Sequence, residues 1–330
     1  MNNLYQKEVS KKFYEERFAQ KGSFLKQEYM SEWGDDKKKR IYELIKSLPL
    51  PESGDVIDFG CGAGVFTEVI RQALPNYNIY GTDFTQLAIN KAKARYKNCT
   101  FIYSTDTRLK SMKFDFLFTH HVLEHVYDLE PVAKEMIQLL KNKSSMLHIL
   151  PCGNVGSLEY NICSLHKNGI IREKENAFFF EDEGHVRRLT TMQVSELFSK
   201  YDFTLIKEYY SEQKYGAIKW ITESNPLLII KMLNPIYGKD IKSKTKLFAL
   251  FILLFSLAMA RMPLILMNRI KKKRHESYKQ KFLYAACLPF YPLSNLVDNY
   301  LKSKAIEEWE KSNREPNGSE MYLFYSRKPE

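Results

Sequence analysis

The segment of residues 56–64, VIDFGCGAG, constrains the fold more than any other stretch of this chain. An apolar run that predicts a strand ends at the acid Asp58, and three glycines follow at a spacing of two, before a helical run over 65–74. Glycine lacks a Cβ, so a turn made from it can be tight and a ligand can lie against bare backbone. The helix start offers unpaired N–H groups and the positive end of a dipole, which suit an anion.

Two classes of ligand fit this loop. Asp58 suits a cation or an amine, so a ligand with a carboxylate next to an ammonium, such as the methionine part of S-adenosylmethionine (SAM), satisfies both ends. A nicotinamide dinucleotide is the rival, and its motif is G-x-G-x-x-G/A. Here the spacing is G-x-G-x-G, and Val65 stands where that motif needs a third small residue. A glycine-rich turn that binds no ligand is the third alternative.

A second strand is predicted over 78–84, and it carries the acid Asp83 near its end. A carboxylate at that place can accept hydrogen bonds from both hydroxyls of a ribose. The neighbouring Phe84 can cover the face of an adenine. The pair therefore favours a nucleoside ligand beside the glycine loop.

Two further strands, over 99–103 and 114–119, also end in polar residues. The first is followed by Thr105 and Asp106, whose carboxylate can accept from an adenine amino group, and the second leads into His120. Polar residues at the carboxyl end of every strand place one cleft along one edge of a parallel sheet. Open α/β sheets bind their ligands at that edge.

In these segments the chain resembles the class I SAM-dependent methyltransferases, in particular the branch of ubiquinone-pathway O-methyltransferases and bacterial small-molecule enzymes. The resemblance covers about residues 30–211 plus a short C-terminal strand. The motifs that carry it are DFGCGAG over 58–64, Asp83, HVLEHV over 121–126 and GHVRRLT over 184–190. It implies an α/β fold, with a Rossmann-like seven-stranded sheet whose last strand is antiparallel.

The resemblance also implies SAM as the cofactor and assigns residues to it. The glycine loop contacts the methionine part, Asp83 the ribose and Asp106 the adenine amine, and His120 lies near the cofactor. The expected cofactor-binding set is Asp58, Gly60, Cys61, Gly62, Gly64, Asp83, Phe84, Thr105, Asp106 and His120.

Two histidines are candidates for a general base. Methyl transfer from SAM needs mainly alignment of the acceptor, and a hydroxyl acceptor also benefits from a base with a pKa near neutral. His185 is the first candidate because it closes the segment 152–188. This segment is predicted to be irregular and is too long for an ordinary connection, which favours an active-site lid or an acceptor-binding segment. His125 is the second, and a structural hydrogen-bonding role is the alternative for both. No metal site is expected, because Glu124 and His125 would point in different directions.

The chain is long enough for one large domain or two, and its 5 cysteines show no paired spacing. Its first ten residues are polar, so a reduced, cytoplasmic compartment is expected. The predicted organisation has N-terminal helices over 1–48 covering the cofactor cleft and a SAM-binding domain over 49–212 plus 319–330. Within that domain a helix is predicted over about 129–141, after the fourth strand. An insertion over 213–318 separates the sixth strand from the seventh.

The basic character of the chain belongs to that insertion. It holds 19 of the 50 Lys and Arg residues but only 8 of the 39 Asp and Glu residues, so the remainder carries 31 of each sign. A nucleic-acid methyltransferase would usually carry positive charge around its own cleft. Nucleic acid is therefore an unlikely partner of the enzyme domain.

The insertion also contains the most apolar stretch of the chain, residues 247–267. A clean membrane span needs about 20 apolar residues, and Arg261 interrupts this one. A single crossing would leave the seventh strand on the wrong side of the membrane, away from the rest of the sheet. Two spans, over 247–267 and 282–297, would place the basic residues 271–274 outside the cell, against the positive-inside rule. We expect a helix that lies in the plane of an anionic membrane surface or re-enters it only shallowly. True spans and a second soluble core, serving as a lid or dimer interface, are the alternatives.

The expected function is transfer of a methyl group from SAM to a lipid-linked, polyprenyl or glycolipid-type acceptor, by a protein held peripherally on the inner face of the cell membrane. One alternative is methylation of a soluble sugar or small metabolite, with the insertion used for oligomerisation. The other is a non-catalytic SAM-binding scaffold at a membrane. The oligomeric state is left open.

Overall fold

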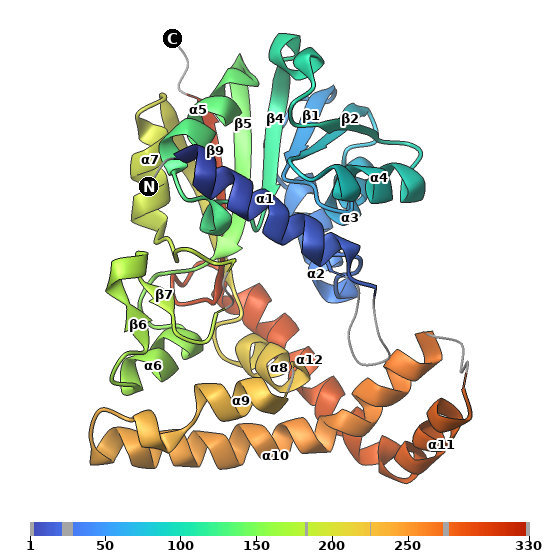
Figure 1. Cartoon of the computed structure of the whole chain (residues 1–330), viewed down its shortest axis with the longest axis vertical. Coiled ribbons are helices and arrows are strands. Elements are labelled where there is room, and N and C mark those ends of the chain that lie inside the picture. Colours follow the sequence, from blue (N-terminus) through green and yellow to red (C-terminus); the bar gives the residue numbers. More distant parts are fainter. Residues whose placement is uncertain (1–2, 22–28, 182–183, 225, 273–276, 328–330) are drawn as a thin grey trace. The chain divides into compact units, whose positions relative to one another are not determined.

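The computed structural model describes residues 3–21, 29–181, 184–224, 226–272 and 277–327 (Figure 1). Its main element is a seven-stranded sheet in the order β3-β2-β1-β4-β5-β9-β8. The strands are β1 (Gly54–Phe59), β2 (Tyr77–Asp83), β3 (Thr100–Tyr103), β4 (Phe114–His120), β5 (Leu140–Pro151), β8 (Phe203–Ser211) and β9 (Glu320–Arg327). The pairs β1–β2, β1–β4, β2–β3 and β4–β5 are parallel, and β9 is the antiparallel strand. The predicted fold class is confirmed.

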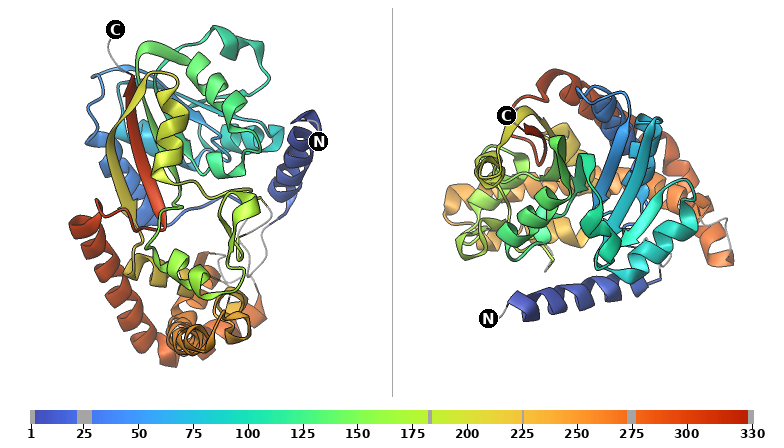
Figure 2. Two further views of the ribbon diagram at one scale, coloured as in Figure 1. Left: turned by 90° about the vertical axis from the view of Figure 1, so that its left-hand side faces the viewer. Right: turned by 90° about the horizontal axis from the view of Figure 1, so that it is seen from above.

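The central strands read as continuous apolar runs because both faces of the sheet are covered. Ile57 on β1, Leu117 on β4 and Leu147 on β5 are fully buried. The elements that accompany these strands are α1 (Asn3–Ala19), α2 (Asp35–Lys46), α3 (Val65–Ala73), α4 (Gln86–Arg95), η1 (Thr107–Ser111), η2 (Leu123–His125), α5 (Leu129–Gln138) and α7 (Thr191–Ser199). Figure 2 shows β9, in red, beside β8.

The chain forms two compact units. Unit 1 comprises 1–150, 191–208 and 322–330, and unit 2 comprises 151–190 and 209–321. The predicted domain boundaries stay predictions, but 151–190 belongs to the same compact unit as most of the insertion. We describe each unit by itself.

Unit 2 is mainly helical, as the insertion was predicted to be. Its elements are α6 (Leu158–Leu165), β6 (Ile170–Ile171), η3 (Arg172–Lys174), β7 (Ala177–Phe178), α8 (Tyr215–Glu223), α9 (Pro226–Met232), η4 (Pro235–Tyr237), α10 (Ile241–Lys272), α11 (Tyr278–Cys287), η5 (Leu288–Phe290) and α12 (Tyr291–Ser312). One apolar cluster joins α6, the β6–β7 pair, α8, α9 and α10, with Ile162, Phe178, Ile221 and Leu254 among its buried members.

Two secondary-structure predictions were wrong. The segment 152–188 is not irregular, because it contains α6 and the antiparallel pair β6–β7. Ser157 caps α6 by accepting from the backbone N–H of Tyr160. From the same segment Ile162, Cys163, Phe178 and Phe180 are buried in the unit 2 core. The helix predicted over 129–141 ends at Gln138, because Leu140 already pairs with Phe114 of β4.

A buried arginine holds the helices of unit 2 together. The side chain of Arg261, in the middle of α10, is 1% exposed. It donates to Oδ1 of Asp298 on α12 at 2.5 and 3.0 Å, and to the backbone oxygen of Lys219 on α8 at 2.6 Å. It also donates to Thr222 Oγ1 at 2.5 Å. One guanidinium therefore links three helices, and its charge is compensated inside the protein.

We expect Arg261→Ala to lower the free energy of unfolding by about 3–5 kcal/mol, because it leaves the carboxylate of Asp298 and two acceptors on α8 without their donor. Chemical denaturation followed by far-UV circular dichroism measures the change. Lys246→Ala, an exposed lysine on the same helix, is the control and should unfold as the parent does. Equal midpoints for the two variants would contradict the role of Arg261.

Candidate functional site

The glycine loop after β1 needs its glycines for both backbone conformation and space. Gly60, Gly62 and Gly64 have φ values of 79°, 53° and 81°, in the left-handed region that favours glycine. A Cβ on Gly60 would lie 2.5 Å from Val122 Cγ2, and one on Gly64 would lie 2.9 Å from Phe101 Cζ. The loop therefore brings bare backbone to the start of α3, for which Gly64 is the N-cap.

Two buried carboxylates flank this loop. Asp58 at the end of β1 accepts from Thr67 Oγ1 at 2.5 Å. Asp83 at the end of β2 accepts from the backbone N–H of Gly62 at 2.9 Å, and its other oxygen accepts from the N–H and hydroxyl of Thr85. The second strand is thereby tied to the loop that follows the first.

Burial makes the charged forms of both acids costly. It raises the pKa of Asp58 to about 7, against the hydrogen bond from Thr67, and the nearby charge of Asp83 adds to the increase. Burial also raises the pKa of Asp83, while the hydrogen bonds from Thr85 and Gly62 oppose the rise. A bound cation would stabilise both carboxylates, so the chemistry of this site fits a ligand with positive charge.

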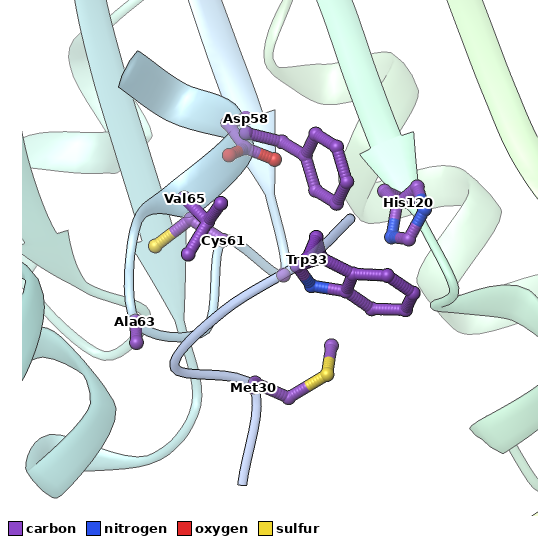
Figure 3. A pocket seen from close by; sticks show the side chains of 9 residues that line it. Met30, Trp33, Asp58, Cys61, Ala63, Val65 and His120 are labelled. Atoms are coloured by element: carbon purple, nitrogen blue, oxygen red, sulfur yellow. The ribbon is translucent and has the colours of Figure 1, made fainter. Parts of the chain in front are cut away.

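A pocket lies between the glycine loop and β4 (Figure 3). Asp58 and Cys61 line it from the loop side, and His120 lines it from the end of β4. Met30 and Trp33 line it from the segment that precedes α2. The full set of lining residues is Met30, Trp33, Asp58, Gly60, Cys61, Ala63, Val65, Phe66 and His120.

The structure thus brings together most of the predicted cofactor residues: Asp58, Gly60, Cys61 and His120 line the pocket, and Gly62, Gly64 and Asp83 shape its loop. Met30, Trp33 and Phe66 escaped sequence reasoning. None of these apolar residues belongs to a recognisable motif, so only the folded chain shows that they line the pocket.

Three predicted residues lie elsewhere. Thr105 is exposed, and Asp106 caps η1 while Arg108 binds both of its carboxylate oxygens. That contact lowers the pKa of Asp106 to about 2. Phe84 is half-buried and packs edge-on against Tyr14, with ring centroids 5.6 Å apart. Their contact with an adenine stays a prediction.

The two histidines predicted as bases are both held by hydroxyl or carboxylate groups and do not line the pocket. His125 Nδ1 lies 2.7 Å from the hydroxyl of Tyr14 on α1. His185, in unit 2, has Nδ1 3.6 Å from Glu181 Oε1. The expectation that Glu124 and His125 point apart was too simple, since His125 Nε2 lies 3.9 Å from Glu124 Oε1. The absence of a metal site stays a prediction.

Comparisons with known proteins identify the family of this chain. Residues 29–208 match a family model described as a methyltransferase domain. Trans-aconitate 2-methyltransferase of Variovorax paradoxus is 27% identical over 108 residues, 32% of this chain and 42% of the relative. The chain thus spans less than half of that relative. Malonyl-[acyl-carrier protein] O-methyltransferase of Bacillus anthracis is 24% identical over 248 residues, 68% of this chain and 90% of the relative.

Among solved structures, the YcgJ protein of Bacillus subtilis matches with 14% identity and a TM-score of 0.43, covering 89% of this chain and 99% of that one.

We expect the unliganded protein to lose stability as the pH rises from about 4 to about 7, because Asp58 has a higher pKa in the folded chain, about 7, than its ordinary value of 3.8. At about 1.4 kcal/mol per pH unit the loss is of the order of 4 kcal/mol. Asp58→Asn should remove this slope, and urea denaturation between pH 4 and 8.5 measures it. Asp35→Asn, at an exposed position on α2, is the control. A parallel pH dependence in parent and Asp58→Asn would contradict the assignment.

Proposed function

We propose that this chain, which belongs to the methyltransferase-domain family, transfers a methyl group from SAM to a lipid-linked, polyprenyl or glycolipid-type acceptor at the cytoplasmic face of the membrane. The family match over 29–208 and the glycine loop with its two acids support the transfer of methyl groups from SAM. The apolar and basic surface of unit 2 supports the acceptor class.

The residues of the pocket fit the cofactor. Backbone groups of the glycine loop and the start of α3 would hold its carboxylate, Asp58 would face its positive charge, and Asp83 would accept from the ribose. When bound, SAM supplies a methyl group that its sulfonium has already activated. The chain's own part is to align the acceptor and to exclude water. Trp33 and His120, whose ring centroids are 4.7 Å apart, close the apolar side of the pocket.

The single observation that carries the acceptor class is the distribution of exposed apolar side chains. Among the described residues, 18 of the 22 large apolar side chains that are exposed lie between Leu227 and Ile306. On α10 they are Ile241, Phe248, Ile252, Leu253 and Met259, which we call the α10 surface. Exposed apolar side chains gathered in one region mark interaction or membrane sites.

The α10 surface lies opposite the face of the helix that packs into unit 2. Leu247, Leu254, Arg261 and Leu264 recur at helical spacing and are buried. Ile241, Phe248, Ile252 and Met259 recur at the same spacing on the other side and are exposed. Figure 1 shows α10, in orange, with α8 and α9 along one side of it. The unit 2 core covers only one apolar face of α10, so the second apolar face stays exposed.

Basic residues precede and follow this surface along the chain. The exposed lysines next to or at the ends of α10 and α11 are Lys239, Lys242, Lys244, Lys246, Lys271, Lys272, Lys279 and Lys281. Each such charge near an anionic leaflet contributes about 1 kcal/mol to binding. An apolar face with lysines at its borders is typical of a segment that lies in the membrane interface.

By length and composition alone, α10 could also cross a membrane, since it has 32 residues. Two contacts favour the in-plane placement. The Arg261 contacts fix α10 to Lys219 on α8 and to Asp298 on α12. If α10 crossed the membrane, these charged residues would have to enter the hydrocarbon layer with it. The chain also enters and leaves the insertion at one place, where Ser319 N–H donates to the backbone oxygen of Ser211.

A soluble acceptor is the second candidate, and the names of the relatives favour it. Trans-aconitate and malonyl-[acyl-carrier protein] are the acceptors that those names print. The unit 2 core, built around Leu254 and Ile221, shows that much of the insertion packs as a soluble protein does. In that case the α10 surface would join two copies of the chain. A non-catalytic SAM-binding scaffold is the third candidate.

The cofactor is tested by Asp83→Ala. We expect this change to weaken SAM binding by about 10- to 100-fold, because it removes a charged acceptor and releases the N–H of Gly62. Isothermal titration calorimetry measures the affinity. Asp106→Ala serves as the comparison and should lose less, since Arg108 occupies its carboxylate. Unchanged affinity in Asp83→Ala would remove the cofactor assignment.

The acceptor location is tested by flotation of the full-length protein with liposomes of anionic phospholipid. We expect the parent to float with these vesicles, and flotation to fall with salt because lysines contribute to it. Phe248→Ser/Ile252→Ser should stay with the soluble fraction. Ile206→Ser, a matched change at a half-exposed position on β8 in unit 1, should float as the parent does.

A parent that stays in the soluble fraction contradicts the membrane proposal. A stable dimer that Phe248→Ser/Ile252→Ser dissociates would favour the soluble candidate instead. Neither result would affect the SAM assignment.

A further inference from the structure

Asp58 and Asp83 form a pair of buried carboxylates in unit 1, and they differ in the hydrogen bonds that they accept. Asp83 accepts from the backbone N–H groups of Gly62 and Thr85 and from the Thr85 hydroxyl. Among the described residues, only the hydroxyl of Thr67 donates to Asp58. Hydrogen bonds to a carboxylate stabilise its charged form. The pair therefore keeps its negative charge on Asp83, and a proton taken up by the pair resides on Asp58.

The charge of this pair is not compensated inside the protein. In the part of the chain that the structure describes, no basic side chain forms an ion pair with either acid. Burial raises the pKa of Asp58 to about 7, against the hydrogen bond from Thr67, and the charge of Asp83 adds to the rise. In the unliganded protein Asp58 is therefore protonated in a large share of the molecules near neutral pH.

Four other titratable groups surround Asp58. Asp83 lies at the end of β2, Cys61 in the glycine loop and Cys99 directly before β3, and His120 lines the same pocket from β4 (Figure 3). Burial raises the pKa of Cys61 well above its ordinary value and that of Cys99 to about 11, so both thiols are neutral at pH 7. An experiment between pH 5 and 7 must therefore separate Asp58 from His120.

Thr67 determines how Asp58 is presented to the pocket. It is fully buried in α3, three residues after the N-cap Gly64. A threonine in a helix commonly donates its hydroxyl to a carbonyl of the preceding turn, but Thr67 donates to Oδ2 of Asp58 at 2.5 Å. A hydroxyl has one proton to donate. This bond therefore holds one oxygen of Asp58 and leaves the other for a proton or a ligand.

We propose that the chain binds SAM only when Asp58 has lost its proton, and that Thr67 is the positioning residue that allows this loss near neutral pH. On binding, the proton passes from Asp58 to the solvent, and the carboxylate faces the positive charge of the cofactor. A cation favours the ionised carboxylate, so the affinity for SAM increases with pH until Asp58 is ionised in the free protein as well. This inference adds a pH control to the proposed function and rests on SAM as the cofactor, not on the acceptor or the membrane.

The pH dependence of SAM affinity tests the role of Asp58. Isothermal titration calorimetry of the full-length protein measures Kd from pH 5 to 7, below the pKa of about 7.7–8.0 that is ordinary for an α-amino group. Because the pKa of Asp58 is about 7, its ionised fraction and the affinity should both rise about 50-fold over this range. Asp58→Asn should bind SAM weakly and without this dependence. Asp35→Asn, at an exposed position on α2, should follow the parent.

Thr67→Val replaces the hydroxyl by a methyl group of similar size and removes the donor. Loss of a hydrogen bond to a charged group should raise the pKa of Asp58 by about one unit. We expect the profile of affinity against pH to move up by the same amount, with binding about fivefold weaker at pH 7. Thr67→Ser keeps the donor and should restore the parent profile. Thr245→Val, at an exposed threonine on α10, is the matched control. An equal loss of affinity at every pH in Thr67→Val would overturn the positioning role.

The number of protons released on binding separates this inference from the proposed function. At pH 6, titrations in two buffers with different heats of ionisation should show that about one proton leaves for each SAM bound. Asp58→Asn should release none. SAM binding without proton release, or release that persists in Asp58→Asn and so belongs to His120, overturns the inference but leaves SAM as the cofactor. No SAM binding at any pH contradicts the cofactor assignment and the inference together.

Discussion

The hydrogen bond from the Gly62 N–H to Asp83 is the contact on which the candidate site depends. It joins the loop after β1 to the end of β2, and it forms only because the glycines adopt left-handed angles that other residues disfavour. Asp58 lies behind the same loop, so two buried carboxylates and a helix start converge on one place. Burial without a compensating cation is costly for both carboxylates, so the chemistry of the site fits a ligand with positive charge.

Unit 2 depends on a different buried charge. Arg261 lies in the middle of a helix whose composition would otherwise allow it to cross a membrane. Because its guanidinium is satisfied by α8 and α12, α10 is part of a folded unit and has an exposed apolar face left over. A helix with one face in a protein core and the other exposed suits an interface better than a bilayer interior. The proposal of a membrane-bound acceptor follows from this combination.

Sequence patterns predicted the first four strands in their order along the chain, because an acid or a histidine stands at or shortly after the carboxyl end of each. They failed over 152–188, where short elements are stabilised by a core contributed from distant residues such as Leu254.

The sequence by itself determined the fold class, the cofactor loop and the placement of a basic, apolar insertion between two strands, because these depend on local backbone preference and on hydrophobic periodicity. The tertiary structure decided which side chains share the pocket, how Arg261 is neutralised and which face of α10 stays exposed. Those properties depend on contacts between residues far apart in the chain, such as Trp33 with His120 and Arg261 with Asp298. No local pattern encodes such contacts, because their energy appears only when the elements have packed.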